Sequence, residues 1–269
     1  MNSDVHPRIS LNLISAMRWS IDQQLALIHS SGLHAISLTT SQLGERPDEV
    51  IGKIRAAGLQ VVSLGSGGVS LIDNDAATLA GLHPLIDAAV ALDCPVAFCV
   101  SGPCPARMST DEAFDRLAST LGPAIAYAQS KGVRLTLEHS SPAMRAHGFV
   151  HSLADAIDLS CETGVGIAVE LQNCWYERKL ARMLSQHVNR FMIVQYSDFL
   201  VGEELRLNRR VPGDGSMPLE WMIGQLLDAG YKGYFDLELL GPRIEAEGYA
   251  SAIGRGIEWL SRRLTCWGI

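Results

Sequence analysis

Four polar residues, each ending an otherwise apolar run, are the main candidates for chemistry in this chain: Glu138 (LTLE), Glu170 (IAVE), Gln195 (MIVQ) and Glu238 (DLE). An ionised carboxylate at the end of a buried run is costly unless it is paired, hydrogen-bonded or bound to a metal. Three carboxylates that converge would repel one another, and a divalent cation is the simplest compensation. Oxygen ligands without cysteine or histidine suit Mn²⁺ or Mg²⁺ better than zinc. The alternative is that each glutamate caps a helix or pairs with an arginine.

Short β-branched runs alternate with longer amphipathic stretches, and this pattern predicts the elements that position these residues. The predicted strands cover residues 8–13, 34–39, 59–64, 95–100, 133–138, 165–170, 191–195 and 233–238. The predicted helices cover residues 20–31, 47–57, 75–92, 110–130, 152–162, 177–188, 218–229 and 249–264. Continuous apolar strands separated by helices indicate a parallel sheet covered on both faces. Eight such units match a single (β/α)₈ TIM barrel over residues 1–269, an α/β fold that typically takes about 250 residues.

An open doubly wound sheet is the rival architecture. It is disfavoured because no GxGxxG follows the first strand, and the glycine-rich residues 65–68 follow the third strand without a Walker lysine. In a TIM barrel the carboxyl ends of the strands form the active-site face. The four polar strand ends are therefore expected at one rim.

The composition excludes several classes of protein. The net charge is −7, from 22 Lys+Arg and 29 Asp+Glu, and the only dense basic cluster is Arg206, Arg209 and Arg210. This is too little for a nucleic-acid track, which needs clustered cations. We expect a cytoplasmic protein, because no secretory signal and no apolar stretch of about 20 residues is found. The six cysteines form no CxxC pair and are expected to be reduced thiols.

The segments RVPGDG (residues 210–215) and GYKGYFDLE (residues 230–238) give the chain a family resemblance. It resembles the sugar phosphate isomerase/epimerase group of xylose isomerase-like TIM barrels, which includes hydroxypyruvate isomerase, ketose 3-epimerases and dehydratases. The resemblance implies one divalent ion, Mn²⁺ or Mg²⁺, held by Glu138, Glu170, Gln195 and Glu238. Three positions depart from the family pattern: Glu170 stands where Asp is usual, Asn173 where His is frequent, and Gln195 where His is usual.

The resemblance also implies the reaction. A metal bound to a carbonyl and an adjacent hydroxyl stabilises the enediolate formed when an α-proton leaves. Glu138 and Glu238 would face each other across the substrate and move that proton. The expected activity is therefore an isomerase or epimerase of a small keto-sugar, keto-acid or cyclitol. The same intermediate also permits a lyase or dehydratase, and the departures leave a non-catalytic sugar-binding protein open. A zinc-dependent abasic-site endonuclease is disfavoured, because the chain lacks a histidine-rich cluster and a basic face.

Five further residues are candidates for substrate binding. Arg210 offers a rigid donor fork for a substrate oxygen, although a solvated loop arginine is nearly as good an interpretation. Asn173 and Trp175 follow the sixth strand and would supply a hydrogen bond and an apolar wall. His147 lies in the long fifth loop, and His139 is expected to face away from the rim by strand alternation. The partner is expected to be a small carbohydrate-like molecule, with neither nucleic acid nor membrane, and the resemblance implies a homodimer or homotetramer.

Overall fold

The computed structural model describes residues 5–66, 69–70, 75–205 and 207–269. Gly67, Gly68 and Arg206, which the sequence singled out, lie outside the described residues.

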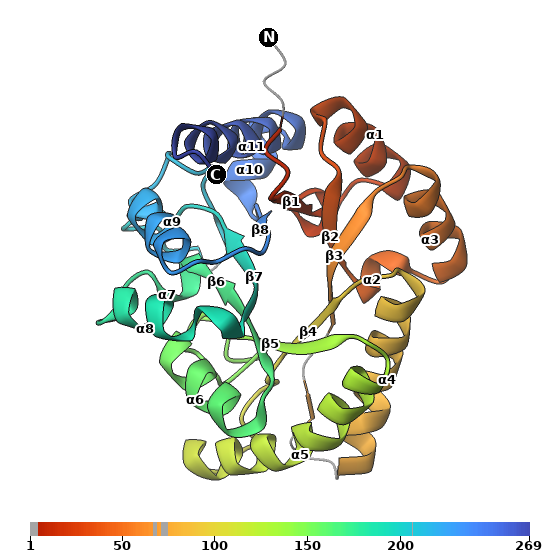
Figure 1. The fold of residues 1–269 in the computed structure, drawn as a ribbon, viewed down its shortest axis with the longest axis vertical. Coiled ribbons are helices and arrows are strands. Elements are labelled where there is room, and N and C mark those ends of the chain that lie inside the picture. Colours follow the sequence, from red (N-terminus) through yellow and green to blue (C-terminus); the bar gives the residue numbers. More distant parts are fainter. Residues whose placement is uncertain (1–4, 67–68, 71–74, 206) are drawn as a thin grey trace.

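Eight parallel strands close into a barrel in chain order, and the helices surround them (Figure 1). The strands are β1 (Ile9–Asn12), β2 (Ala35–Thr39), β3 (Gln60–Gly65), β4 (Val96–Val100), β5 (Arg134–Glu138), β6 (Gly166–Glu170), β7 (Phe191–Tyr196) and β8 (Phe235–Leu237). Pairing of β8 with β1, in which Ile9 lies opposite Phe235, closes the sheet. The predicted (β/α)₈ barrel is confirmed.

The long helices lie close to their predicted positions. They are α1 (Ile21–Ser31), α3 (Pro47–Ala56), α4 (Asp75–Ala91), α5 (Thr110–Ser130), α6 (Leu153–Thr163), α8 (Leu180–His187), α9 (Leu219–Asp228) and α11 (Tyr249–Cys266). The prediction that α8 begins at residue 177 is wrong. Glu177 instead accepts hydrogen bonds from the backbone of Leu153 and Ala154 at the start of α6. Lys179 then adopts a left-handed conformation, with φ of 65°, before the helix starts.

In the part of the chain that the structure describes, five short helices were not predicted: η1 (Leu13–Ala16), α2 (Thr40–Leu43), α7 (Leu171–Cys174), η2 (Val188–Arg190) and α10 (Pro242–Glu247). Segments this short contain too few turns for a 3.6-residue period to be recognised. Three of them, η1, α2 and α7, directly follow β1, β2 and β6, so they begin at the carboxyl-terminal rim.

Local sequence signals fix the ends of several long helices. Ser20 and Ser109 each form a capping box, with Gln23 and Glu112 respectively, at the start of α1 and α5. Gly32 ends α1 in the left-handed conformation, with φ of 75°, which glycine adopts without steric cost. Such caps set where each helix stops and the next strand begins.

The barrel interior changes from apolar to polar toward the rim. A small cluster, separate from the main core between strands and helices, contains Ala35, Val62, Phe98, Ala168 and Ile193. Side chains two residues apart on a strand share a face, so Glu170 lies on the same face as Ala168 and Gln195 on the same face as Ile193. The polar residues of the rim thus lie directly above this apolar cluster in the barrel interior.

Among the described residues, no helix combines the length and apolar character needed to cross a bilayer.

Candidate active site

The structure brings the four predicted strand-end residues together at the carboxyl-terminal rim. Glu138 and Glu170 end β5 and β6, Gln195 lies in β7 opposite Glu170, and Glu238 directly follows β8. The exposed fractions of Glu170, Gln195 and Glu238 are only 0%, 1% and 7%. The Nε2 atom of Gln195 donates a hydrogen bond of 2.8 Å to Oε2 of Glu238. Two buried carboxyl groups and the partly buried Glu138 therefore lie at one rim.

The negative charge of this cluster is offset in part by Arg209, a residue that the sequence placed only in a basic cluster. Its Nη1 lies 2.6 Å from Oε2 of Glu170, and its Nη2 lies 2.8 Å from Oε1 of Glu238. Nη1 also donates to the backbone oxygen of Glu238 at 3.0 Å and to Oγ of Ser197 at 3.3 Å. The predicted substrate arginine, Arg210, instead pairs with Glu203 at 2.8 Å. The structure places Arg209, and not Arg210, among the residues of the rim.

The Arg209 guanidinium is a permanent cation. Burial works to lower the pKa of Arg209, but the negative charges of Glu170 and Glu238 outweigh it and raise that pKa above the ordinary value. Arginine does not lose its proton in proteins. The cluster therefore contains a fixed positive charge at every working pH.

The two carboxyl groups expected to exchange protons have different surroundings. Burial, followed by the charges of Glu238 and Glu170, raises the pKa of Glu138 well above its usual value, and Arg209 and Gln195 offset this only in part. Burial also raises the pKa of Glu238, where Arg209 and the Asn12 amide oppose it. The pKa of Glu138 is thus the one raised well above its usual value, while the oxygens of Glu238 accept hydrogen bonds from Arg209, Asn12 and Gln195.

A cavity of about 360 Å³ opens over these residues at the barrel mouth. Glu138, Glu238 and Arg209 line it, together with Asn12 and Gln172. Hydroxyl groups come from Thr39, Thr40, Ser41, Ser66, Ser140 and Ser141, and apolar surface from Ile14, Phe98, Val100, Met144, Leu207 and Leu240. Many of these side chains belong to segments that follow the strands, so the pattern of apolar strands in the sequence did not identify them.

The other candidates for substrate binding fall into two groups. Asn173 and His147 line the cavity, and the Asn173 amide donates to the backbone oxygen of His139 at 2.9 Å. His139 itself is fully buried, and neither ring nitrogen has a hydrogen-bond partner among the described residues. Burial lowers the pKa of His139 to about 4, so its ring is neutral. Trp175 packs edge-on against Tyr176, with ring centroids 6.0 Å apart.

The loop that carries Arg209 is held by Asp198, which is 2% exposed. Its Oδ2 accepts the backbone N–H groups of Gly213 at 3.0 Å and Gly215 at 3.1 Å. Its Oδ1 accepts those of Phe199 at 2.8 Å and Met217 at 3.1 Å. A Cβ atom at Gly215 would lie 2.1 Å from Oδ1 of Asp198, so this approach requires glycine. One carboxylate thus fixes both ends of the loop.

Replacing Asp198 by Asn is expected to lower the free energy of unfolding by about 3 kcal/mol. The amide would turn an NH₂ group toward backbone donors, and each lost hydrogen bond to a charged group is worth about 1.5–3 kcal/mol. Urea unfolding measures the change. The matched control is Asp214→Asn in the same loop, which removes only an exposed ion pair with Arg255 and is expected to cost at most about 1 kcal/mol. Equal losses in the two variants would contradict the clamping role of Asp198.

The arrangement at the rim does not fit the divalent ion that the sequence predicts. Oε2 of Glu170 is bound by Arg209, and its Oε1 accepts the backbone N–H of Gln172 at 3.0 Å. Oε1 of Glu238 is bound by Arg209 as well. Its Oε2 accepts the amides of Asn12 at 2.9 Å and Gln195 at 2.8 Å. All four oxygens of these two carboxylates therefore already have a donor from the protein.

Two of the predicted metal ligands remain, Glu138 and the Oε1 atom of Gln195. Mg²⁺ requires about six oxygen ligands in octahedral geometry, and manganese also prefers an oxygen-rich set. Within the described ranges, no group of three or more His, Cys, Asp or Glu side chains is arranged to hold an ion. The expected Mn²⁺ or Mg²⁺ would have to displace the Arg209 guanidinium, and it is disfavoured by that positive charge.

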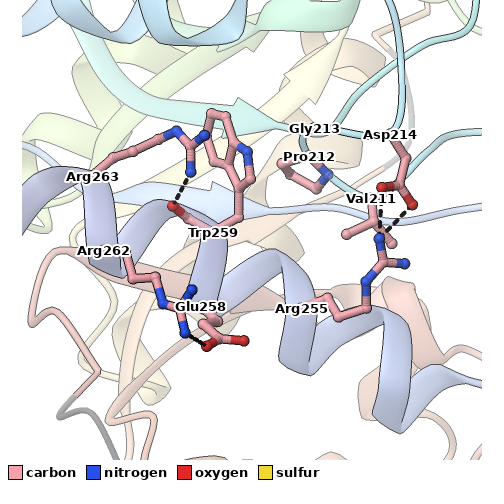
Figure 2. A pocket seen from close by; sticks show the side chains of 9 residues that line it. All are labelled: Val211, Pro212, Gly213, Asp214, Arg255, Glu258, Trp259, Arg262 and Arg263. Carbon is pink, nitrogen blue, oxygen red and sulfur yellow. Dashed lines mark hydrogen bonds and ion pairs between the residues drawn. The ribbon is translucent and has the colours of Figure 1, made fainter.

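A second cavity lies between α11 and residues 211–214, as Figure 2 shows. Its three arginines each meet a carboxylate: Arg255 pairs with Asp214 at 2.6 Å, Arg263 with Glu220 at 2.5 Å, and Arg262 with Glu258. The Arg263 guanidinium also stacks 3.9 Å from the centroid of the Trp259 ring. The carboxylates of this cavity, Asp214 and Glu258, are exposed, whereas Glu238 at the barrel mouth is buried, so the barrel mouth is the better candidate for an active site.

Comparison with known proteins agrees with this fold. The model of the family described as xylose isomerase-like TIM barrel matches residues 25–263. No curated protein sequence matches the chain.

Three solved structures illustrate the likeness. Protein SMc04130 from Sinorhizobium meliloti 1021 is 21% identical, with a TM-score of 0.85 over 93% of this chain and 96% of that one. An IolI protein with a bound zinc atom is 15% identical, with a TM-score of 0.82 over 96% and 98% of the two chains. The 3-keto-D-glucoside 4-epimerase YcjR from E. coli is 18% identical, with a TM-score of 0.74 over 95% and 99%. At these identities the likeness establishes a shared fold.

Proposed function

Because the chain belongs to the family of xylose isomerase-like TIM barrels, we propose that it is an isomerase or epimerase that moves a proton beside the carbonyl group of a small keto-sugar or related polyol. The observation that carries the proposal is that Glu138 and Glu238 line one cavity in different electrostatic surroundings. Paired titratable groups whose surroundings separate their pKa values are the usual basis of acid–base assignments. One structural neighbour is a 3-keto-D-glucoside 4-epimerase, and that activity is compatible with this chemistry.

The proposed reaction uses two proton transfers. The Glu238 carboxylate takes a proton from the carbon next to the substrate carbonyl, and the C–H electron pair forms a C=C bond while the carbonyl oxygen gains the negative charge. Glu138, whose pKa is raised well above its usual value, supplies a proton and recovers one when the cycle ends. In isomerisation, Glu238 returns the proton to the former carbonyl carbon, while Glu138 protonates the former carbonyl oxygen and takes the proton of the neighbouring hydroxyl group, whose oxygen becomes the new carbonyl. In epimerisation, Glu138 protonates the original carbon from the opposite face, the carbonyl forms again, and exchange with solvent restores both glutamates.

The proposed substrate is neutral and unphosphorylated. Among the described residues that line the cavity, Arg209 is the one Lys or Arg side chain, and Glu170 and Glu238 already neutralise it. A phosphate would therefore bring its charge toward a net negative site. The hydroxyl side chains around the mouth suit the hydroxyl groups of a polyol, and apolar neighbours such as Phe98 and Met144 suit its C–H faces. The keto-acid expected from the sequence is less well matched for the same electrostatic reason.

The proposal is tested by incubating the protein in D₂O with a panel of unphosphorylated ketopentoses, ketohexoses and keto-inositols. We expect at least one compound to give a product of equal carbon skeleton with one deuterium at the reacting carbon, detected by ¹H NMR and mass spectrometry. The same panel with phosphorylated sugars is the matched comparison, and we expect slower exchange there.

Other outcomes separate the remaining candidates. Release of water from the substrate would identify the dehydratase alternative, in which a leaving group β to the carbanion departs. Saturable sugar binding without any deuterium incorporation would favour a non-catalytic sugar-binding protein and would overturn the proposed reaction. A metal-dependent form of the reaction requires Arg209 to leave both carboxylates, so both proton transfers are assigned to the chain's own residues.

A further inference from the structure

The position of the Arg209 guanidinium carries an inference about the charge of the site. The side chain is 7% exposed and bridges Glu170 at 2.6 Å and Glu238 at 2.8 Å, two of the four residues that the sequence predicts as metal ligands. We propose that Arg209 is the built-in cation of this barrel and takes the place of a divalent ion, so that the native protein has no metal site at its rim. This inference rests on the proposed function only for its catalytic consequence.

The amide of Gln195 contacts the Glu238 carboxylate through its nitrogen and so adds to the donors around that group. Its Nε2 donates to Glu238, so its Oε1 is the atom left over, and Oε1 is buried without a hydrogen-bond partner among the described residues. The opposite amide orientation would place an acceptor against the Glu238 carboxylate. Since Asn12 also donates to that oxygen, Glu238 is surrounded by three side-chain donors, Arg209, Asn12 and Gln195. Three of the roughly four lone-pair sites of this carboxylate are therefore taken by donors of the protein, which makes it a poor metal ligand.

The guanidinium is held by the fold and not by the acids alone. The backbone N–H of Arg209 donates to the oxygen of Leu240 at 2.8 Å. The next residue, Arg210, exchanges backbone hydrogen bonds of 2.8 and 2.9 Å with Asp198. Nη1 donates to the backbone oxygen of Glu238. Displacing the cation would therefore break the Nη1 hydrogen bond to the Glu238 backbone in addition to two ion pairs.

The same group is placed to assist the proposed reaction. Arg209 lines the cavity, and its Nε is buried without a hydrogen-bond partner among the described residues. A buried donor without a partner is unfavourable until an acceptor reaches it. A substrate oxygen that gains negative charge as Glu238 removes the proton would be such an acceptor, and a fixed cation needs no reorganisation to stabilise it. The guanidinium keeps all its protons throughout, so only the two glutamates exchange them.

The test is a titration of the purified, chelator-treated protein with MnCl₂. Binding is measured by isothermal titration calorimetry and by the electron paramagnetic resonance signal of free Mn²⁺. We expect the wild type to show no stoichiometric binding up to 1 mM Mn²⁺, a limit that corresponds to about −4.1 kcal/mol. We expect Arg209→Met to bind one Mn²⁺ per chain at least 10-fold more tightly, and Arg209→Met/Glu170→Gln to lose that binding. Arg209→Gln, which keeps a donor for Glu170, replaces the methionine variant if the latter does not fold.

One Mn²⁺ bound by the wild type and lost in Glu170→Gln would overturn the proposal. So would a folded Arg209→Met or Arg209→Gln protein that binds no Mn²⁺, because the guanidinium would then not occupy the position of an ion. Both readouts are independent of turnover, so they distinguish failure of this inference from failure of the isotope-exchange test. Where exchange is detected, it is expected to persist unchanged in the presence of chelator.

Discussion

Replacing Glu238 by Gln is expected to lower kcat for the deuterium exchange by about 10³-fold, within the range of about 10²–10⁴ that general acid–base groups contribute. The carboxylate is the proposed proton acceptor, and an amide does not accept a proton at neutral pH. The change also disturbs the site, because the NH₂ group would face either Arg209 or the donors of Asn12 and Gln195. Single-turnover NMR in D₂O, with thermal unfolding of the same sample, separates the chemical loss from loss of the folded protein.

The matched control is Glu258→Gln, the same chemical change in an ion pair on α11 with Arg262. Its partner is 70% exposed and Glu258 itself 48% exposed, so we expect turnover within about twofold of the wild type and a stability change below about 1 kcal/mol. A Glu238→Gln protein that is folded and turns over at the wild-type rate would exclude Glu238 as the base.

Replacing Asp236 by Asn is expected to make the protein more stable than the wild type at pH 8. Asp236 is fully buried, and it accepts hydrogen bonds from Oγ of Ser10 at 2.6 Å and from Oγ of Ser37. Burial raises the pKa of Asp236 from 3.8 to about 7, against the effect of the two serines. Since this raised pKa favours the protonated form in the native state, the folded protein binds more protons than the unfolded chain between these two values.

The sign of the pH dependence follows from linkage. Where the native state binds more protons, the free energy of unfolding falls as pH rises, so the Asp236 contribution declines from about pH 4 to about pH 7. At about 1.4 kcal/mol per pKa unit, the total decline is about 4 kcal/mol. An Asn side chain does not titrate, and its unmatched NH₂ donor would cost about 1–3 kcal/mol at all pH values. The net gain expected at pH 8 is therefore about 2 kcal/mol, and at pH 4 the variant should be the less stable protein.

Urea unfolding at pH 4, 6 and 8 measures this crossing of the two stability curves. Asp158→Asn, at an exposed position of α6, is the control and should follow the wild-type pH dependence. Parallel curves for Asp236→Asn and the wild type would show that Asp236 does not change its protonation in this range.

The barrel and its polar rim were predictable because their signals repeat. Apolar runs ending in Glu138, Glu170, Gln195 and Glu238 mark strand after strand, and strand pairing then brings those ends to one rim. Short helices such as α2 and α7 were missed because four residues carry no period. The side chains that they add to the cavity, among them Thr40 and Gln172, were missed with them.

The choice between Arg209 and Arg210 could not be made from the sequence, because both stand side by side in a loop. The structure decides it through an isolated antiparallel bridge between Asp198 and Arg210. In an extended segment, consecutive side chains point to opposite sides. Once Arg210 pairs with Glu203 on one side, Arg209 enters the rim on the other. The bridge depends on contacts between distant residues that no local pattern encodes.

The hydrogen bonds of Asp198 fix the two ends of the loop independently of the residues at its tip. Asp198 binds backbone N–H groups and leaves the side chains at residues 200–205 unconstrained by its carboxylate, and Val201 is 63% exposed. Exposed loop tips are where insertions are best tolerated. Residues inserted after Val201, such as an affinity tag or a binding peptide, would therefore lengthen the tip. The Arg209 guanidinium would keep its contacts with Glu170 and Glu238 at the rim. Such an insertion leaves Glu203 and its ion pair with Arg210 in the chain.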